Sequence, residues 1–263
     1  MSFSRMISHL FVLVFFSISA FGTDFEGDGR LDIAVWRPSN GTWYVIPTTN
    51  PAAPIVQQWG GTGDIPVVMD VDGDFKFDYA VWRPSTGVWF VIPSTNPGTP
   101  IIQEWGTRGD VPISYADFDG DHVSDIAVWR PSNGTWYILP SSNPTAPIVK
   151  AWGQAGDIPV PTDFDGDNKH DISVWRPSNG TWYSLPSSNP TTAIVQAWGQ
   201  AGDIPVSADY NGDGLTDFAI FRPTDGSWWI LPFGDPSGIY MQLWGTAGDI
   251  PIYSHFTNAL VTQ

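Results

Sequence analysis

The sequence predicts an all-β protein, a five-bladed β-propeller of four-stranded antiparallel blades whose ring is closed by the C-terminal strand. Three observations predict it: five copies of one unit of 46 or 47 residues, four short β-like runs in each copy, and a spare strand sequence after the last copy. The copies cover 24–69, 70–116, 117–162, 163–208 and 209–255, followed by a tail at 256–263. This period is typical of propeller blades and too long for leucine-rich repeats.

The third copy illustrates the four runs. Residues 125–130 and 135–139 form two runs joined by a Pro-Ser-Asn-Gly turn, in which Asn-Gly favours positive φ, so we expect a hairpin. A third run covers 147–152 and a fourth covers 157–160, with Gly-containing turns between them. Four antiparallel strands per radially repeated unit describe a propeller blade.

The ends of the repeat array predict how the ring closes. The first copy has no preceding Gly-Asp-Ile-Pro strand, whereas a spare one follows the last copy at 248–252. We expect this strand to complete the first blade of its own chain, giving a monomer, because the ends of a compact ring are close together. The alternative is that it enters the first blade of a neighbouring molecule, which would build a head-to-tail polymer.

Composition excludes several classes of protein. The 263 residues are 42% hydrophobic and 14% aromatic, enough to fill a core, and include no cysteine. The lack of cysteine rules out a disulfide framework, a thiol nucleophile and a thiolate metal site. The net charge of −16 argues against nucleic acid or an anionic membrane as a partner.

The first 22 residues resemble a signal peptide. Arg5 gives a positive start, 10–16 is an unbroken apolar run, and small residues follow at 19–22. Seven apolar residues cannot span a bilayer, which needs about 20. We therefore expect export to the extracellular space or periplasm, no membrane insertion, and one mature propeller domain at 23–263.

Each copy opens with the pattern Asp-x-Asp-Gly-Asp-x-x-x-Asp or a near variant. The predicted metal-ligating side chains are Asp24, Glu26, Asp28 and Asp32; Asp70, Asp72, Asp74 and Asp78; Asp117, Asp119, Asp121 and Asp125; Asp163, Asp165, Asp167 and Asp171; and Asp209, Asn211, Asp213 and Asp217. The carbonyl oxygens of Arg30, Lys76, Val123, Lys169 and Leu215 are expected to complete each shell. Four carboxylates within nine residues repel one another unless a cation lies between them.

Hard oxygen ligands around a glycine turn suit calcium, so we predict up to five Ca²⁺ ions, one per repeat. The loop differs from an EF-hand, because its glycine is at position four and no glutamate follows at position twelve. Solvated acidic turns would explain one such loop. Five in register favour metal binding.

The run D-x-D-G-D-x-x-x-D-x-A-V-W-R-P-S-x-G resembles the FG-GAP/VCBS repeat, found in integrin α-chain propellers, bacterial secreted proteins and fungal lectins. The resemblance covers 24–255. It implies a propeller with Ca²⁺ in the blade loops, held by the aspartates named above. Integrin and fungal-lectin members have seven blades, so five is counted from this sequence. Trp-Gly and Gly-Asp-Ile-Pro stand where the family has its name motifs.

Tryptophans recur up to three times per copy, either as platforms for sugar rings or as bulk between blades. We favour the second role for any single tryptophan. Those just after the hairpin turn are the best candidates for partial exposure and ligand binding: Trp43, Trp89, Trp136, Trp182 and Trp228. Recurrent arginines before proline and aspartates before Ile/Val-Pro predict structural ion pairs. An anion site is the alternative.

No catalytic residue is predicted. Propeller glycosidases use an asymmetric pair of carboxylates at the hub, and five near-identical blades offer none. We expect a secreted, calcium-stabilised, non-catalytic module that binds an extracellular glycan or cell-surface protein multivalently. A structural protein that polymerises by strand exchange is the second hypothesis, and a polysaccharide hydrolase or lyase is the third.

Overall fold

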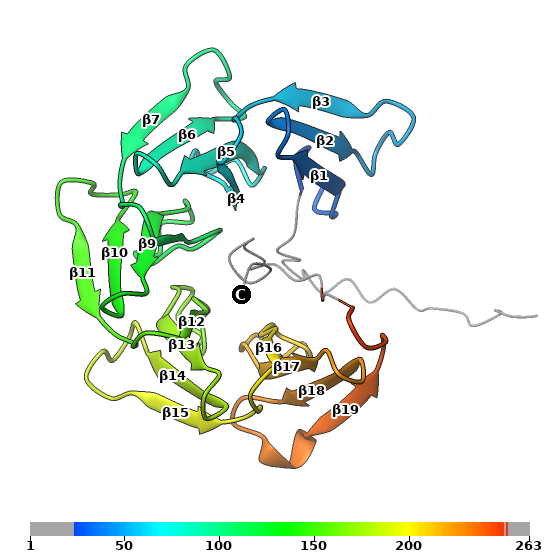
Figure 1. Ribbon diagram of the computed structural model, residues 1–263, viewed down its shortest axis with the longest axis vertical. Helices are drawn as coiled ribbons and strands as arrows, with labels where there is room; N and C mark the ends of the chain where they lie inside the picture. Colours follow the sequence, from blue (N-terminus) through cyan, green and yellow to red (C-terminus); the bar gives the residue numbers. More distant parts are fainter. Residues whose placement is uncertain (1–23, 250, 252–263) are drawn as a thin grey trace, which may run out of the picture.

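Five antiparallel sheets are arranged around a ring in the computed structural model, which describes residues 24–249 and 251 (Figure 1). The prediction of an all-β, five-bladed propeller is confirmed. The predicted signal peptide at 1–22 and the tail at 256–263 lie outside the described residues. Within the described part, no helix is long and apolar enough to cross a membrane.

The first blade contains β1 (Ile33–Arg37), β2 (Thr42–Ile46) and β3 (Ile55–Gln58). The next two contain β4 (Ile65–Met69), β5 (Asp78–Arg83), β6 (Val88–Ile92) and β7 (Ile101–Glu104), then β8 (Val111–Pro112), β9 (Ile126–Arg130), β10 (Thr135–Leu139) and β11 (Ile148–Ala151). The last two contain β12 (Ile158–Pro159), β13 (Ile172–Arg176), β14 (Thr181–Leu185) and β15 (Ile194–Ala197), then β16 (Ile204–Pro205), β17 (Phe218–Arg222), β18 (Ser227–Leu231) and β19 (Tyr240–Leu243). A 3-10 helix, Pro236–Gly238, precedes β19.

Each four-stranded blade takes its innermost strand from the end of the preceding repeat. For example, β4 pairs with β5 and β8 pairs with β9, so every blade joins two successive copies. In Figure 1 these strands line the hub, and β3, β7, β11, β15 and β19 form the outer rim. The first blade has three strands in the described part, and its predicted fourth strand, 248–252, includes two residues outside it.

The hairpin turn predicted between the two central strands of each blade depends on its glycine. In the third blade Gly134 has φ of 63°, and a Cβ there would collide with the carbonyl group of Gly153. The backbone N–H of Trp152 donates to the Gly134 carbonyl at 2.8 Å. The turn and the outer strand therefore approach so closely that no side chain fits between them.

The core lies in the contacts between blades as much as inside them. Val128 of the third blade packs in the same cluster as Trp82 and Trp89 of the second, and Val174 of the fourth packs with Trp129 and Trp136 of the third. The blades are thus wedged together by large rings, which fixes the positions of the loops at the hub.

Candidate metal centre

The acidic loops connect the innermost strand of a blade to its second strand. Residues 70–78 run from the end of β4 to the start of β5. Positions four and six of this loop, Gly73 and Phe75, have φ of 75° and 62°. Positions four and six are left-handed in all five copies, with Phe75, His122 and Asn168 the non-glycine residues at position six. The chain therefore turns sharply twice within nine residues.

The first aspartate organises the turn. Asp70 accepts backbone hydrogen bonds from Asp72 (3.2 Å), Gly73 (2.7 Å) and Phe75 (2.9 Å). At the other end Asp78 accepts from the backbone of Val71 at 2.7 Å. These bonds curl the loop around its own carboxylates, as Asp side chains do in tight turns.

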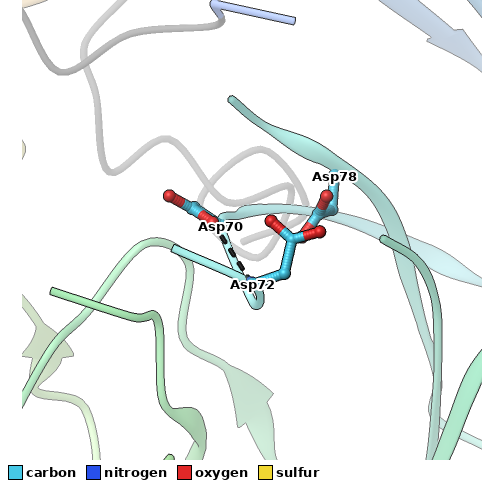
Figure 2. Close-up of side chains that lie close together, drawn as sticks. All are labelled: Asp70, Asp72 and Asp78. Atoms are coloured by element: carbon cyan, nitrogen blue, oxygen red, sulfur yellow. Dashed lines mark hydrogen bonds between the residues drawn. The ribbon is translucent and has the colours of Figure 1, made fainter. Parts of the chain in front are cut away.

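The curled loop brings three carboxylates together in the second blade. One oxygen of each of Asp70, Asp72 and Asp78 lies within 4.8 Å of the other two, and Figure 2 shows Asp72 and Asp78 facing each other from opposite ends of the loop, with Asp70 beside Asp72. The next two blades repeat the group, with Asp117, Asp119 and Asp125 in the third and Asp163, Asp165 and Asp167 in the fourth. Groups of this kind can hold a metal ion.

Two of the carboxylate oxygens are buried and have no hydrogen-bond partner in the described part of the chain. They are Oδ1 of Asp72 and Oδ1 of Asp165, at position three of the second and fourth loops. An unpaired carboxylate oxygen away from water is costly, and a cation bound there would remove the cost. The residues present therefore fit a metal with oxygen ligands.

The last carboxylate of these loops is the most perturbed. Burial, followed by the charges of neighbouring loop aspartates, raises the pKa of Asp78, Asp125 and Asp171 to about 7. Each of these three aspartates is at most 1% exposed. A metal ion would supply the positive charge that these buried groups lack.

In the first four blades, hydroxyl residues in a second connection clamp the acidic loop. In the second blade Ser94 Oγ donates to Asp74 at 2.6 Å, and Thr95 donates to Asp72 through its backbone at 3.0 Å and through its hydroxyl. Ser94 N also donates to Asp78 at 2.7 Å. Sequence reasoning missed these hydroxyl residues. The recurrent pair of Ser or Thr before Asn-Pro was the available signal.

The other predicted ligands are placed differently. Asp74 and Asp121 accept the clamp bonds and lie outside the convergent groups, as does Asp171 in the fourth blade. Among the described residues no such group forms in the first loop, where Glu26 instead accepts bonds from Thr48 and Thr49, or in the fifth. The carbonyl ligands at position seven stay a prediction.

Neighbouring loops are linked to each other. The backbone N–H at position eight of one loop donates to the carbonyl at position one of the preceding loop: Phe77 to Asp24 (2.8 Å), Ser124 to Asp70 (2.6 Å), His170 to Asp117 (2.7 Å) and Thr216 to Asp163 (3.3 Å). In the middle two links the side chain also accepts from the same residue, through Ser124 Oγ and His170 Nδ1. The loops thus form one connected band.

The predicted arginine–aspartate pairs are confirmed at four positions. Arg83, Arg130, Arg176 and Arg222 pair with Asp64, Asp110, Asp157 and Asp203, with Nε–Oδ1 distances of 2.7–2.8 Å. A second nitrogen of each guanidinium bonds the other carboxylate oxygen at 2.8–2.9 Å. Each pair joins the residue directly before the innermost strand to the end of the strand beside it, so its role is structural.

The favoured core role is confirmed for four of the five tryptophans after the hairpin turn, and the expectation that these four would be partly exposed is wrong. Trp43, Trp89, Trp136 and Trp182 are at most 3% exposed, and only Trp228, in the fifth blade, is half-buried. The indole N–H groups of Trp89, Trp136 and Trp182 donate to the carbonyl of the third tryptophan of the same repeat at 2.9–3.0 Å. These rings fill the core. Because successive side chains of a strand point to opposite faces, the residue after each of these tryptophans lies on the other face.

No protein-family model and no curated protein matches the chain. Solved structures with a similar fold include a streptogramin B lyase, with a TM-score of 0.55 and 8% identity over 90% of this chain and 70% of that chain. Another is an Agrocybe aegerita lectin described as recognising non-reducing terminal N-acetylglucosamine, with a TM-score of 0.56 and 16% identity over 86% of this chain and 65% of that one.

A third is the dihydro-heme d1 dehydrogenase NirN, with a TM-score of 0.50 and 14% identity, of which this chain spans 46%. The chain thus spans less than two thirds of the length of the lectin and of NirN. At these identities the likeness shows the propeller fold alone, and that fold serves a lectin and two enzymes.

Proposed function

We propose that this protein is a secreted, calcium-stabilised propeller that acts as a non-catalytic, multivalent binding module. The observation that carries the metal part is the convergence of three carboxylates in three successive blades, with a buried oxygen of Asp72 and of Asp165 left without a partner. Carboxylate oxygens in a loop with left-handed turns suit Ca²⁺ rather than a softer metal. The resemblance to FG-GAP/VCBS repeats supports the same assignment.

Repetition of the site supports a structural ion. A catalytic centre needs one asymmetric arrangement of acid and base, whereas these carboxylate groups recur in consecutive blades with the same backbone hydrogen bonds. The fold is shared with a lyase, so a hydrolase or lyase is the competing function. The repeated loop geometry favours binding.

The binding surface that we propose consists of the five aromatic residues that come directly after the tryptophans at the hairpin turns. These residues are half-buried, and each lies under an arginine guanidinium at 4.2–5.2 Å: Tyr44, Phe90, Tyr137, Tyr183 and Trp229. An aromatic ring beside a guanidinium offers a stacking surface and hydrogen-bond donors, a combination that suits a sugar. Five equivalent weak sites would bind a clustered extracellular glycan through avidity.

A glycan array with the full mature chain, run in calcium and in EDTA, tests the proposal. We expect binding in calcium that is lost in EDTA and weakened in the double variant Tyr137→Ser/Tyr183→Ser. Trp136→Ala is the matched control, because loss of a buried ring should cost about 3–5 kcal/mol of stability and leave the affinity of the folded protein unchanged.

Three outcomes separate the parts of this proposal. Failure to bind any glycan in calcium would contradict the proposal of a glycan ligand. An absence of heat on calcium titration would contradict the proposal of a calcium site. Turnover of a glycan on the array would replace binding by catalysis.

A further inference from the structure

The four junctions between successive blades share one knob-and-socket contact. A Cβ added to Gly60, Gly106, Gly153 or Gly199 would lie 3.0–3.2 Å from the side chain of Val81, Val128, Val174 or Ile220 of the next blade. The knob is therefore an aliphatic side chain on the second strand of a blade. The socket is the Trp-Gly segment that follows the outermost strand of the preceding blade, where only glycine leaves enough room.

A hydrogen bond accompanies each of these contacts. The indole N–H of Trp59, Trp105, Trp152 and Trp198 donates across the junction to the carbonyl of Phe90, Tyr137, Tyr183 and Trp229 at 3.0–3.1 Å. The same tryptophan thus seals one blade against the next.

The first blade carries a fifth knob that nothing in the described part of the chain covers. Val35 of β1 is the counterpart of Val81, Val128, Val174 and Ile220 in the repeat, yet it is 58% exposed where they are at most 1% exposed. Ile33 on the same strand is 68% exposed. An aliphatic strand face of this kind is normally covered in a folded protein.

The fifth blade carries an empty socket. A hollow of about 620 Å³ is lined by Phe221, Trp228, Trp244, Gly245, Thr246, Asp249 and Pro251. Trp244 is 78% exposed, whereas its four counterparts are half-buried and bonded to the next blade. The socket and the knob lie on the fifth and first blades, which are neighbours around the ring in Figure 1.

Charge complements shape at the same two edges. Asp249 accepts from the backbone of Thr246 at 2.8 Å, as Asp157 does from Gln154 at 2.9 Å in the pair with Arg176. Arg37 lies over Tyr44 at 4.3 Å, as Arg176 lies over Tyr183. Arg37 and Asp249 therefore have the same local contacts as the arginines and aspartates of the four complete pairs.

We propose that the first blade docks into the socket of the fifth blade of its own chain. Val35 packs against Gly245, the Trp244 indole N–H donates to the Tyr44 carbonyl, and Arg37 pairs with Asp249. The occupant is the chain's own first blade, because both halves of the interface lie in one molecule and four identical junctions already connect the rest of the ring. A second copy would have to compete with an intramolecular partner.

Two aspartate substitutions at equally exposed valines test this closure. Val56 on the outer strand β3 is 60% exposed, so Val56→Asp is the matched control for Val35→Asp. In the closed ring Val35→Asp buries a charge and should lower the Tm by about 10 °C, while Val56→Asp leaves it nearly unchanged. Equal melting of the two variants would overturn the proposal.

A double-mutant cycle keeps the test decisive if Val35→Asp fails to fold. If Arg37 and Asp249 form a pair, the double variant Arg37→Ala/Asp249→Ala should have a Tm no lower than that of the less stable single variant. The same result is expected for the control cycle on the pair Arg130 and Asp110. Additive losses at Arg37 and Asp249 would overturn the ion pair. Light scattering should give a monomer, and an oligomer that Val35→Asp dissociates would assign the socket to a second copy and overturn intramolecular closure.

Discussion

At the scale of single residues, the carboxylates of one loop are not equivalent. Burial and the charges of Asp72 and Asp70 raise the pKa of Asp78 to about 7. Burial also acts on Asp72, but hydrogen bonds from Thr95 and Asp74 together outweigh it and lower the pKa of that carboxyl. The loop therefore holds a buried acid that resists ionisation beside one that favours it. A cation is needed before all the carboxylates of the loop can ionise together.

These shifts predict opposite pH dependence with and without calcium. In the unfolded chain Asp78, Asp125 and Asp171 have their ordinary pKa of 3.8, so they are ionised between pH 4 and 7. In the folded, metal-free chain their pKa is about 7, so they stay protonated over most of the same window. Raising the pH through this window therefore destabilises the metal-free fold. Calcium needs ionised ligands, so the calcium-loaded fold should gain stability over the same window. Melts from pH 4 to 7.5, with calcium and with a chelator, measure both slopes.

One histidine opposes this trend without reversing it. Burial lowers the pKa of His170 from 6.5 to about 4, so its contribution to stability rises with pH in the same window. It is one group against three aspartates, each with a larger shift. Asp125→Asn should make the metal-free slope shallower, and Asp225→Asn, an exposed carboxyl with a lowered pKa, should leave it unchanged. A metal-free protein that gains stability from pH 4 to 7 would contradict the assignment.

The sequence predicted which residue types gather in the loops but not which aromatic faces outward. Trp136 and Tyr137 are adjacent and both aromatic, so composition cannot tell them apart. Their sides are set by packing against the next blade, where Trp136 is fully buried and Tyr137 stays half-exposed under Arg130. A placement decided by contacts between repeats cannot be predicted from one repeat.

At the scale of elements, the strands of the third copy were largely predictable. The runs expected at 125–130 and 135–139 are β9 and β10, and those at 147–152 and 157–160 contain β11 and β12. Turn glycines and apolar strand residues are local signals, so the elements follow from them. The clamp on the acidic loop was not predictable, because Ser141 and Asp121 are twenty residues apart and meet only once the blade has formed.

The clamp predicts a loss of calcium affinity in an element that contributes no predicted ligand. Ser141 and Ser142 donate hydroxyl bonds to Asp121 and Asp119 at 2.7 and 2.6 Å, holding both carboxylates in place. Ser141→Ala/Ser142→Ala should therefore weaken one calcium step by about fivefold, as expected for loss of a net hydrogen bond. Calorimetric titration of the full chain measures the step.

A substitution in the same connection provides the control. Thr145 donates to Asn143 at 2.7 Å and touches no loop carboxylate, so Thr145→Ala should leave the titration unchanged. The fifth blade is a natural comparison, since Phe233 stands where the other blades have the first hydroxyl residue. Phe233 keeps the backbone bond to Asp217 at 3.0 Å but offers no hydroxyl. Equal affinity with and without the two serine hydroxyls would show that the clamp only shapes the loop.

At the scale of the whole molecule, the blades are connected by the metal loops as well as by the core. Backbone bonds run from each of the last four acidic loops to the loop before it, and tryptophan bonds cross the same junctions further out. A loop that loses its ion therefore disturbs a contact that belongs to its neighbour. Blades joined in this way should not unfold one at a time, unlike the separate repeats of an open array.

Calcium removal should consequently lower one melting transition rather than add a second. With a Kd of about 0.1 mM in about 2 mM calcium, each site adds about 1.8 kcal/mol. The three blades with convergent carboxylates would together add about 5 kcal/mol, so EDTA should lower the Tm by about 10–20 °C. Differential scanning calorimetry with calcium, EDTA, and EDTA followed by excess calcium measures the shift and its reversal.

Disabling one loop with Asp117→Asn/Asp119→Asn should lower the Tm of the single transition by about a third of the full shift, because the linked loops unfold together. A separate early transition in that variant would instead mean that each blade unfolds independently. A Tm that EDTA does not change would show that calcium does not stabilise the fold.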